Sequence, residues 1–265
     1  MQTKTEELKT EIVNLTPENI GNYGVCGYKD VKKQVELRRK IDWYSKYYAD
    51  GLRIKALIVN PGGYQGMIEY MPGEIAHRPV DANGYLFIQC IFVGFKSEFK
   101  GKGLATFLVN EVIREAREKN KKGVAVVTRA GSFMVDKNLF LKSGFVVTDK
   151  AKPDFELLAL NFNDNKEIPV FKPSVNITHP EYKTGLVIMR SPQCPYTEKN
   201  VNAIIESGVK MGFEPKVVEL NDARMIQESP CAFGSFSIIL NGEIIAHHPI
   251  SNTRFENIMK SKLRT

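Results

Sequence analysis

The sequence has few of the residues on which several classes of protein depend. Its 265 residues include 4 cysteines, 4 histidines and 1 tryptophan, and no two cysteines form a Cys-x-x-Cys pair. This excludes a disulfide-stapled scaffold and the usual zinc modules, so we predict reduced thiols and no metal site. No apolar run approaches the roughly 18 residues of a membrane span, and residues 1–10 are too polar for a secretory signal. We therefore expect a cytoplasmic protein that does not contact a membrane.

The excess of positive charge is modest. The chain has 37 Lys and Arg against 30 Asp and Glu, which gives a net charge of +7. Such a charge suits an anionic ligand such as a nucleotide cofactor, but it is also common in soluble proteins. The basic run at residues 119–122 is typical of a solvated helix end. Nucleic acid is therefore not favoured as a partner, and a homo-oligomer remains open.

A polar stretch that contains prolines divides the chain. Residues 161–185 include Pro169, Pro173 and Pro180 and sustain neither helical nor strand periodicity. The chain is also longer than a typical domain of about 100 to 150 residues. We predict two domains, at residues 1–165 and 185–265, joined by a linker at residues 166–184.

Apolar spacing and turn signals predict the order α-α-β-β-β-α-β-α-β in the first domain. We therefore predict the α/β (α+β) fold class. The first three strands are expected to form an antiparallel meander. One helix is expected to start at Thr16, and three more are expected at residues 30–48, 103–120 and 135–143. Strands are expected at residues 54–59, 64–70, 85–93, 124–128 and 155–160.

A glycine-rich run opens the third of these helices: Lys100, Gly101, Lys102, Gly103, Leu104 and Ala105. Glycines let the backbone approach a ligand, and the first free N–H groups of a helix attract phosphate. The run lacks the Lys-Ser or Lys-Thr of a P-loop, and Thr106 stands where a dinucleotide fingerprint needs glycine. The sequence therefore predicts that a diphosphate binds here in some other type of site.

This run and the later segment Leu139-Phe140-Leu141-Lys142-Ser143-Gly144-Phe145 resemble two motifs of the GNAT superfamily of N-acetyltransferases, over most of residues 10–162. The resemblance implies a mixed sheet with helices on both faces, and acetyl-CoA as acetyl donor. It also implies that the cofactor diphosphate rests on the amides of Gly101 to Ala105, beside Lys100 and Lys102. By the same resemblance, Phe92 and Val93 pair with the pantetheine arm and Phe140 contacts the cofactor.

The reaction implied by the resemblance is direct attack of a neutral amine on the thioester, without a covalent enzyme intermediate. A carboxylate or histidine would accept the amine proton, and Glu69 leads the candidates, ahead of Glu74 and His77. Phe140 stands where the family usually has a proton-donating tyrosine. Cys90 is the replacement donor that we select, with Tyr85 and Ser132 as alternatives, although all of these residue types are also common in packing or turns.

The second domain has the predicted order β-α-β-α-β-β-α, which resembles the thioredoxin fold. Cys194-Pro195-Tyr196-Thr197 is similar to the glutaredoxin Cys-Pro-Tyr-Cys, with Thr197 in place of the second cysteine. A thiol at a helix N-terminus is expected to have a lowered pKa, so Cys194 is a candidate reactive residue and Cys231 a candidate resolving thiol. The whole arrangement resembles acetyltransferases that carry a YoaP-like C-terminal domain.

These features predict an N-acetyltransferase that moves an acetyl group from acetyl-CoA to an amine of a small molecule or peptide. The alternative is a non-catalytic protein that binds acyl-CoA or senses redox state through its thiols. A monothiol oxidoreductase that uses Cys194 is a third interpretation, which Thr197 and Gly234 disfavour.

Overall fold

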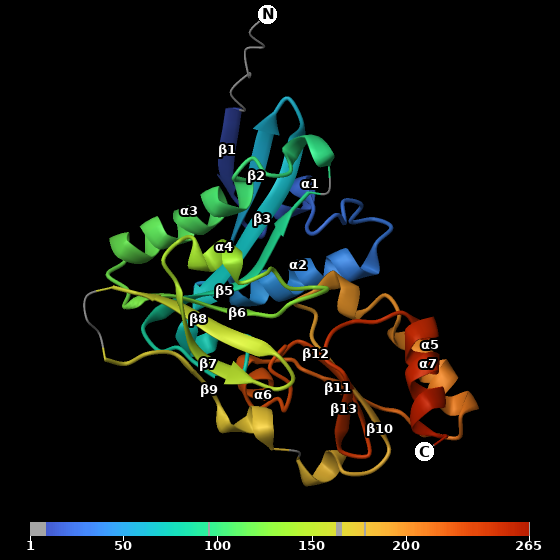
Figure 1. Ribbon diagram of the computed structural model, residues 1–265. Helices are drawn as coiled ribbons and strands as arrows, with labels where there is room; N and C mark the ends of the chain where they lie inside the picture. The colour runs from blue at the N-terminus through green and yellow to red at the C-terminus, as the bar shows by residue number, and fades with distance from the viewer. Residues whose placement is uncertain (1–8, 95, 163–165, 178, 265) are drawn as a thin grey trace, which may run out of the picture.

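The computed structural model describes residues 9–94, 96–162, 166–177 and 179–264, and its largest element is a seven-stranded sheet (Figure 1). The strand order is β1-β2-β3-β5-β6-β8-β7. Neighbouring strands are antiparallel except β5 and β6, which are parallel. The strands are β1 (Lys9–Asn14), β2 (Arg53–Asn60), β3 (Gly63–Pro72), β5 (Tyr85–Val93), β6 (Gly123–Thr128), β7 (Val146–Ala151) and β8 (Phe155–Asn161).

A second sheet of four strands follows in the order β11-β10-β12-β13. Strands β10 and β11 are parallel, and the other two pairings are antiparallel. Its elements are β10 (Leu186–Arg190), α5 (Val201–Lys210), β11 (Lys216–Glu219), α6 (Ala223–Gln227), β12 (Phe236–Leu240), β13 (Glu243–Ala246) and α7 (Asn252–Lys262). Between the two sheets, β9 (Val170–Phe171) pairs with β4 (Val80–Asp81), so part of the expected linker is bound to the first half of the chain.

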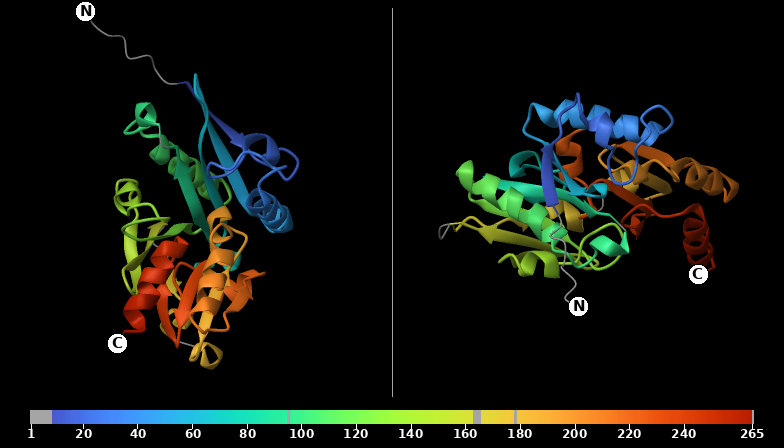
Figure 2. Two further views of the ribbon diagram at one scale, coloured as in Figure 1. Left: turned by 90° about the vertical axis from the view of Figure 1, so that its right-hand side faces the viewer. Right: turned by 90° about the horizontal axis from the view of Figure 1, so that it is seen from above.

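Two long helices lie on opposite faces of the seven-stranded sheet, α2 (Val35–Tyr48) and α3 (Leu104–Glu118) (Figure 2). The apolar side of α3 packs in one core cluster with β5, β6 and β8, and α2 packs in another with β2 and β3. The helices α1 (Ile20–Tyr23) and α4 (Asn138–Leu141) are single turns. Short 3-10 helices occur at Gly73–Ile75, Ser97–Phe99, Pro173–Asn176, Pro180–Tyr182 and Pro195–Thr197.

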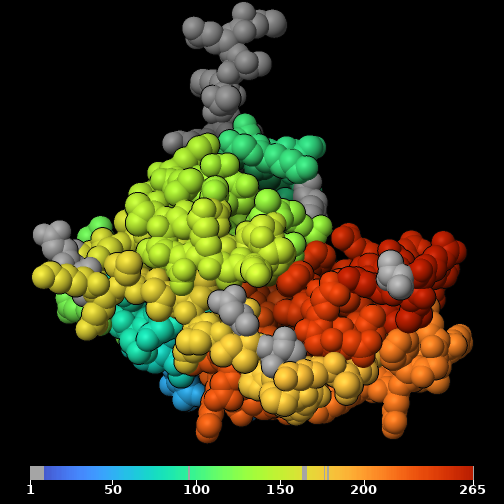
Figure 3. All heavy atoms as spheres, turned by 60° about the horizontal axis from the view of Figure 1, so that its bottom comes forward, coloured from blue at the N-terminus to red at the C-terminus, as the bar shows by residue number. Residues whose placement is uncertain are grey.

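The C-terminal sheet packs on the same face of the large sheet as α2. Met71 and Phe87 stand opposite each other in β3 and β5, so their side chains point to one face. Met71 belongs to the core under α2, whereas Phe87 shares a core with Ile188 and Phe236 of the C-terminal sheet. The C-terminal residues accordingly lie against residues 130–160 on the surface (Figure 3). The two halves therefore share one continuous apolar core.

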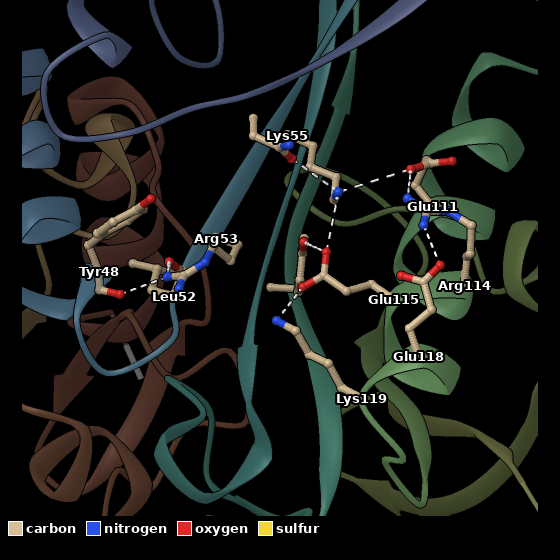
Figure 4. A network of polar contacts seen from close by, with 11 residues as sticks. Tyr48, Leu52, Arg53, Lys55, Glu111, Arg114, Glu115, Glu118 and Lys119 are labelled. Carbon is tan, nitrogen blue, oxygen red and sulfur yellow. Dashed lines mark hydrogen bonds and ion pairs between the residues drawn. The ribbon is translucent and has the colours of Figure 1, made fainter.

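Side chains of β2 and β3 hold α3 in place through a polar network (Figure 4). Lys55 is almost buried, with 6% of its side chain exposed, and its ammonium lies 3.2 Å from Glu115 and 4.0 Å from Glu111. The hydroxyl of Tyr70 also donates to Glu115. Because these contacts fix the middle of α3, they also fix the glycine-rich run at its N-terminus.

Several predicted boundaries were wrong. Strands β1 and β7 were not predicted, since both carry polar residues and lie at the two edges of the large sheet. Helix α2 begins at Val35 rather than at Asp30, because the Asp30 carboxylate accepts the N–H groups of Lys32 and Lys33 in a turn.

Helix lengths were also overestimated. Helix α1 begins at Ile20 rather than at Thr16, and of the helix predicted at 135–143 only α4 forms. The helix expected directly after Cys194 is divided into the 3-10 turn Pro195–Thr197 and α5.

Candidate active site

Strands β5 and β6 separate halfway along their length. They pair from Tyr85 to Ile88 on β5, and beyond that point β5 continues to Val93 with β3 as its only partner strand among the described residues. The separation coincides with a bulge, because Tyr70 pairs with Ile88 while Glu69 pairs with Cys90, which leaves Gln89 as the extra residue. A bulge bends its strand away from a neighbour. One edge of β5 is therefore open after Ile88.

The open edge of β5 presents backbone groups that can bind a ligand. The N–H of Gly94 donates to the carbonyl of Gln65 on β3. Backbone groups alternate in direction along a strand, so the N–H groups of Ile91 and Val93 face away from β3. Of the two residues predicted to pair with the pantetheine arm, Val93 has its polar backbone on the open edge and Phe92 does not.

A cavity of about 50 Å³ lies where the two strands part. Residues from both halves of the chain line it, and most are apolar. The lining residues are Arg78, Ile88, Gln89, Cys90, Ile91, Val126, Val127, Phe133, Met134, Val135, Phe140, Gln193, Cys194 and Phe233. The cavity therefore combines the open edge of β5 with a wall supplied by the C-terminal half.

The start of α3 has the geometry of an anion site. Gly101 and Gly103 have φ angles of +71° and +74°, which favour glycine, and an added Cβ at either would meet no atom within 4 Å. Gly103 is the N-cap and makes no side-chain capping hydrogen bond. Lys100 and Lys102 are exposed, while the buried side chain of Leu104 anchors the turn to the core. A diphosphate bound to the run from Lys100 to Ala105 stays a prediction, with which this geometry agrees.

The remaining predicted residues fall into two groups. Cys90, Cys194 and Phe140 all line the cavity, and Phe140 packs edge-on against Phe145 with ring centres 5.5 Å apart. Glu69 lies behind the cavity, is 0% exposed, and forms an ion pair with the buried Lys40. Its second oxygen accepts a hydrogen bond of 2.8 Å from Gln193, which does line the cavity.

The alternative acid and base candidates lie elsewhere. His77 is fully buried, neither of its ring nitrogens has a hydrogen-bond partner among the described residues, and burial lowers its pKa to about 3. Glu74 accepts the N–H of Gly84, and Tyr85 donates to Asn161 at the opposite end of β5. Ser132 is an exposed turn residue. None of these side chains lines the cavity.

The four thiols differ in acidity. A hydrogen bond from Cys26 lowers the pKa of Cys90, helped by the positive charges of Lys40 and Arg78, and raises the pKa of Cys26 itself. Burial raises the pKa of Cys194 to about 12, opposite to the prediction from a helix N-terminus. The reason is that Cys194 precedes a single 3-10 turn rather than α5. The sulfur of Cys231 contacts His247 at 3.7 Å, and burial raises the pKa of this thiol to about 11.

Sequence reasoning missed the polar residues that complete the cavity: Arg78, Gln89 and Gln193. No local motif marks them, because they come together only through the bulge in β5 and the docking of the C-terminal half. Gly234 shows how close this docking is, since a Cβ there would lie 2.7 Å from the carbonyl oxygen of His77.

Two features are absent from the described residues. None of their helices has both the length and the apolar character needed to cross a membrane. Among the same residues, His, Cys, Asp and Glu side chains nowhere gather in a group of three or more that could hold a metal ion.

Comparison with known proteins gives matches over the C-terminal region and over the whole chain. A family model described as YoaP-like matches residues 216–257, which confirms the predicted YoaP-like C-terminal region. The chain is also 26% identical over 252 residues to a Bacillus subtilis (strain 168) protein named "Uncharacterized N-acetyltransferase YoaP". That match covers 94% of this chain and 98% of the relative, and the relative's name agrees with the predicted enzyme class.

The chain also matches solved structures. A GNAT family N-acetyltransferase (YhbS) from Escherichia coli in complex with CoA is 15% identical, with 64% of this chain and 93% of that chain covered and a TM-score of 0.40. Ard1 from Thermoplasma volcanium is 16% identical, with 58% and 99% covered and a TM-score of 0.40.

Proposed function

We propose that this protein is an acetyl-CoA-dependent N-acetyltransferase of the GNAT type, which transfers the acetyl group to an amine by direct attack. The observation that carries the proposal is the open edge of β5 beyond Ile88, next to a cavity and on the segment that leads into the glycine turn of α3. The full-length similarity to the Bacillus subtilis protein supports the same activity.

Each part of the chain has a distinct task in binding acetyl-CoA. The free amides from Gly101 to Ala105 hold the diphosphate, with Lys100 and Lys102 adding positive charge. The outward N–H of Val93 pairs with the pantetheine arm. Phe92 lies next to Val93 on β5, with its backbone N–H facing β3. Phe140 closes the cavity with an apolar surface that excludes water from the thioester.

Proton transfer falls to Cys90 in this proposal. Cys90 and Cys194 are the cavity-lining thiols, and the pKa of Cys90 is lowered whereas that of Cys194 is raised to about 12. The more acidic thiol is the better donor to the departing CoA sulfur. Glu69 is a positioning residue, because its carboxylate holds Gln193 at the cavity wall but does not reach the cavity. The acetylated nitrogen then gives its extra proton to the Cys90 thiolate, which restores the thiol.

The C-terminal region is proposed to be a thioredoxin-like domain at residues 185–265, following a domain at 1–165 and a linker at 166–184. Support comes from the strand order β11-β10-β12-β13 with a parallel first pair. Its task here is structural, since it supplies Gln193, Cys194 and Phe233 to the cavity wall. The raised pKa of the half-buried Cys194 and the contact of Cys231 with His247 give no support to a redox cycle.

The proposal is tested by calorimetric titration with acetyl-CoA and by a screen of amines that measures release of free CoA. We expect binding and turnover. Gly103→Ala is expected to weaken acetyl-CoA binding about tenfold, because a left-handed φ costs an alanine about 1–2 kcal/mol and the turn would change shape.

Gly212→Ala is the matched control. Gly212 also has a positive φ, +84°, and an added Cβ there would meet no atom within 4 Å, but it lies just after α5. Both variants should lose similar stability, and Gly212→Ala alone should keep its acetyl-CoA affinity. Absence of acetyl-CoA binding to the wild type would exclude the proposal, and binding without turnover of any amine would favour the non-catalytic alternative.

A further inference from the structure

We propose that Arg78 and Gln89 form a binding site for the amino and carboxylate groups of the acceptor, so that the acceptor is an amine that also carries a carboxylate, as an amino acid does. This inference rests on the proposed function and adds to it the chemical class of the second substrate. The side chain that points to this class is Arg78, which forms no ion pair with the described residues.

Arg78 is a buried cation that forms no ion pair with a carboxylate in the described part of the chain. It is 5% exposed and lines the cavity. Its guanidinium donates to the carbonyl of His77 at 3.1 Å, and weakly to the Ser235 hydroxyl at 3.5 Å and the Gln89 carbonyl at 3.4 Å. None of the ion pairs among the described residues includes it. A guanidinium has five N–H donors, so part of its fork remains free.

The charge of this guanidinium persists at neutral pH. Burial lowers the pKa of Arg78, but only to about 10. Phe233 lies 4.9 Å from the guanidinium carbon and gives partial compensation through its ring. A buried charge normally requires a partner, and a planar guanidinium binds a carboxylate with two parallel hydrogen bonds. Because the Arg78 guanidinium has no anionic partner among the described residues, we expect it to bind a planar anionic group.

Gln89 adds the complementary acceptor. Its side-chain nitrogen donates to the carbonyl of His77 at 3.0 Å, while its side-chain oxygen is buried and has no partner within the described part of the chain. Gln89 is 4% exposed and lines the same cavity. An unpartnered amide oxygen accepts a hydrogen bond from an amine N–H. The cavity thus offers one acceptor for an amine and one cation for a carboxylate.

The size and place of the cavity agree with this ligand. A volume of about 50 Å³ accommodates roughly four water-sized groups, which matches the head group of an amino acid. Cys90, the proposed proton donor, follows Gln89 directly on the open part of β5. An amine held at Gln89 is therefore next to the place where acetyl transfer is proposed to occur.

The test compares matched amines in the CoA-release assay: L-alanine with ethylamine, and L-leucine with 3-methylbutylamine. Each pair differs by the carboxylate alone. We expect the wild type to prefer the amino acid, and Arg78→Met to raise KM for the amino acids about 10- to 100-fold, the loss typical of a charged hydrogen bond. The same variant should leave KM for the plain amines unchanged. Arg78→Lys keeps the charge but not the fork and should have an intermediate effect.

Arg117→Met is the control, because Arg117 also lies over a phenylalanine ring, Phe162 at 4.1 Å, but does not line the cavity. It should change no KM. Equal use of both members of each pair by the wild type would overturn the inference, as would an equal loss for both members in Arg78→Met.

If no amine is acetylated, the proposed function fails and the binding site is judged separately. Acetate, glycine and L-alanine are then titrated while the melting temperature is recorded. Stabilisation of the wild type and Arg117→Met, but not of Arg78→Met, would keep the binding site. No stabilisation of the wild type by any of the three would overturn it.

Discussion

Two buried cations of this protein have opposite environments. Lys40 of α2 is 1% exposed, forms an ion pair with Glu69, and lies 4.1 Å from the ring centre of Trp43. Arg78 is 5% exposed and has no carboxylate partner among the described residues. Lys40 belongs to a closed region in which the protein satisfies its own charge, and Arg78 belongs to a region that is open to a ligand.

The difference shows which buried charges serve the fold and which serve binding. A buried ion pair is satisfied within the chain, so its loss is felt as a loss of stability. An unpaired buried charge costs stability in the free protein and is compensated only when a ligand binds. Gln193 joins the two regions, since its amide donates to Glu69 and it lines the cavity with Arg78.

The largest effect is expected for Lys40→Met. Because it leaves the Glu69 carboxylate buried without a counter-charge, it should lower the free energy of unfolding by about 3–5 kcal/mol. Arg78→Met removes an unpaired charge and should change stability by less than about 1 kcal/mol. Urea denaturation of both variants measures the difference. Adding Glu69→Gln to Lys40→Met should restore about half of the lost free energy of unfolding. Equal losses of free energy in Lys40→Met and Arg78→Met would contradict the comparison.

A smaller effect is expected for Cys90, which stands opposite Glu69 on β5 and also lines the cavity. Removing a proton donor typically costs a factor of about 100 or more in rate, so Cys90→Ala should lower kcat about 100-fold. Cys194→Ala is the control and should change kcat less than about threefold, since burial raises the pKa of Cys194 to about 12. Equal losses of kcat in Cys90→Ala and Cys194→Ala would contradict the assignment of Cys90 as the proton donor.

The pH profile sharpens the same prediction. A donor must be protonated, so the pH profile of kcat should have a falling limb as the pH rises through the pKa of Cys90. The hydrogen bond from Cys26 is the main cause of the lowered pKa. Cys26→Ala should therefore shift the fall in kcat to higher pH, whereas Cys231→Ala, whose sulfur contacts His247 instead, should not move it.

Local features and features that depend on long-range docking also differ in how far the sequence predicts them. The glycine turn at Gly101 and Gly103 is predicted because conformation and spacing are local, and so is β5, whose predicted range 85–93 matches the structure. Arg78 is not predicted, because its environment depends on the docking of Gly234 and Phe233 from more than 150 residues away. The lowered pKa expected for Cys194 was wrong because burial raises it and because only a 3-10 turn, rather than α5, follows this residue.

The smallest effect is expected at the residue that joins the two regions. Gln193→Leu removes the hydrogen bond to Glu69 but leaves the ion pair with Lys40, so the free energy of unfolding should fall by about 1.5 kcal/mol. Gln227→Leu is a matched control, because Gln227 also links the two halves, through the carbonyls of Glu74 and Ala76, but does not line the cavity. Denaturation should give similar losses for both variants, and the CoA-release assay should give a raised KM for the acceptor in Gln193→Leu alone. A raised KM in both would mean that docking of the C-terminal half, rather than the contact made by Gln193, shapes the cavity.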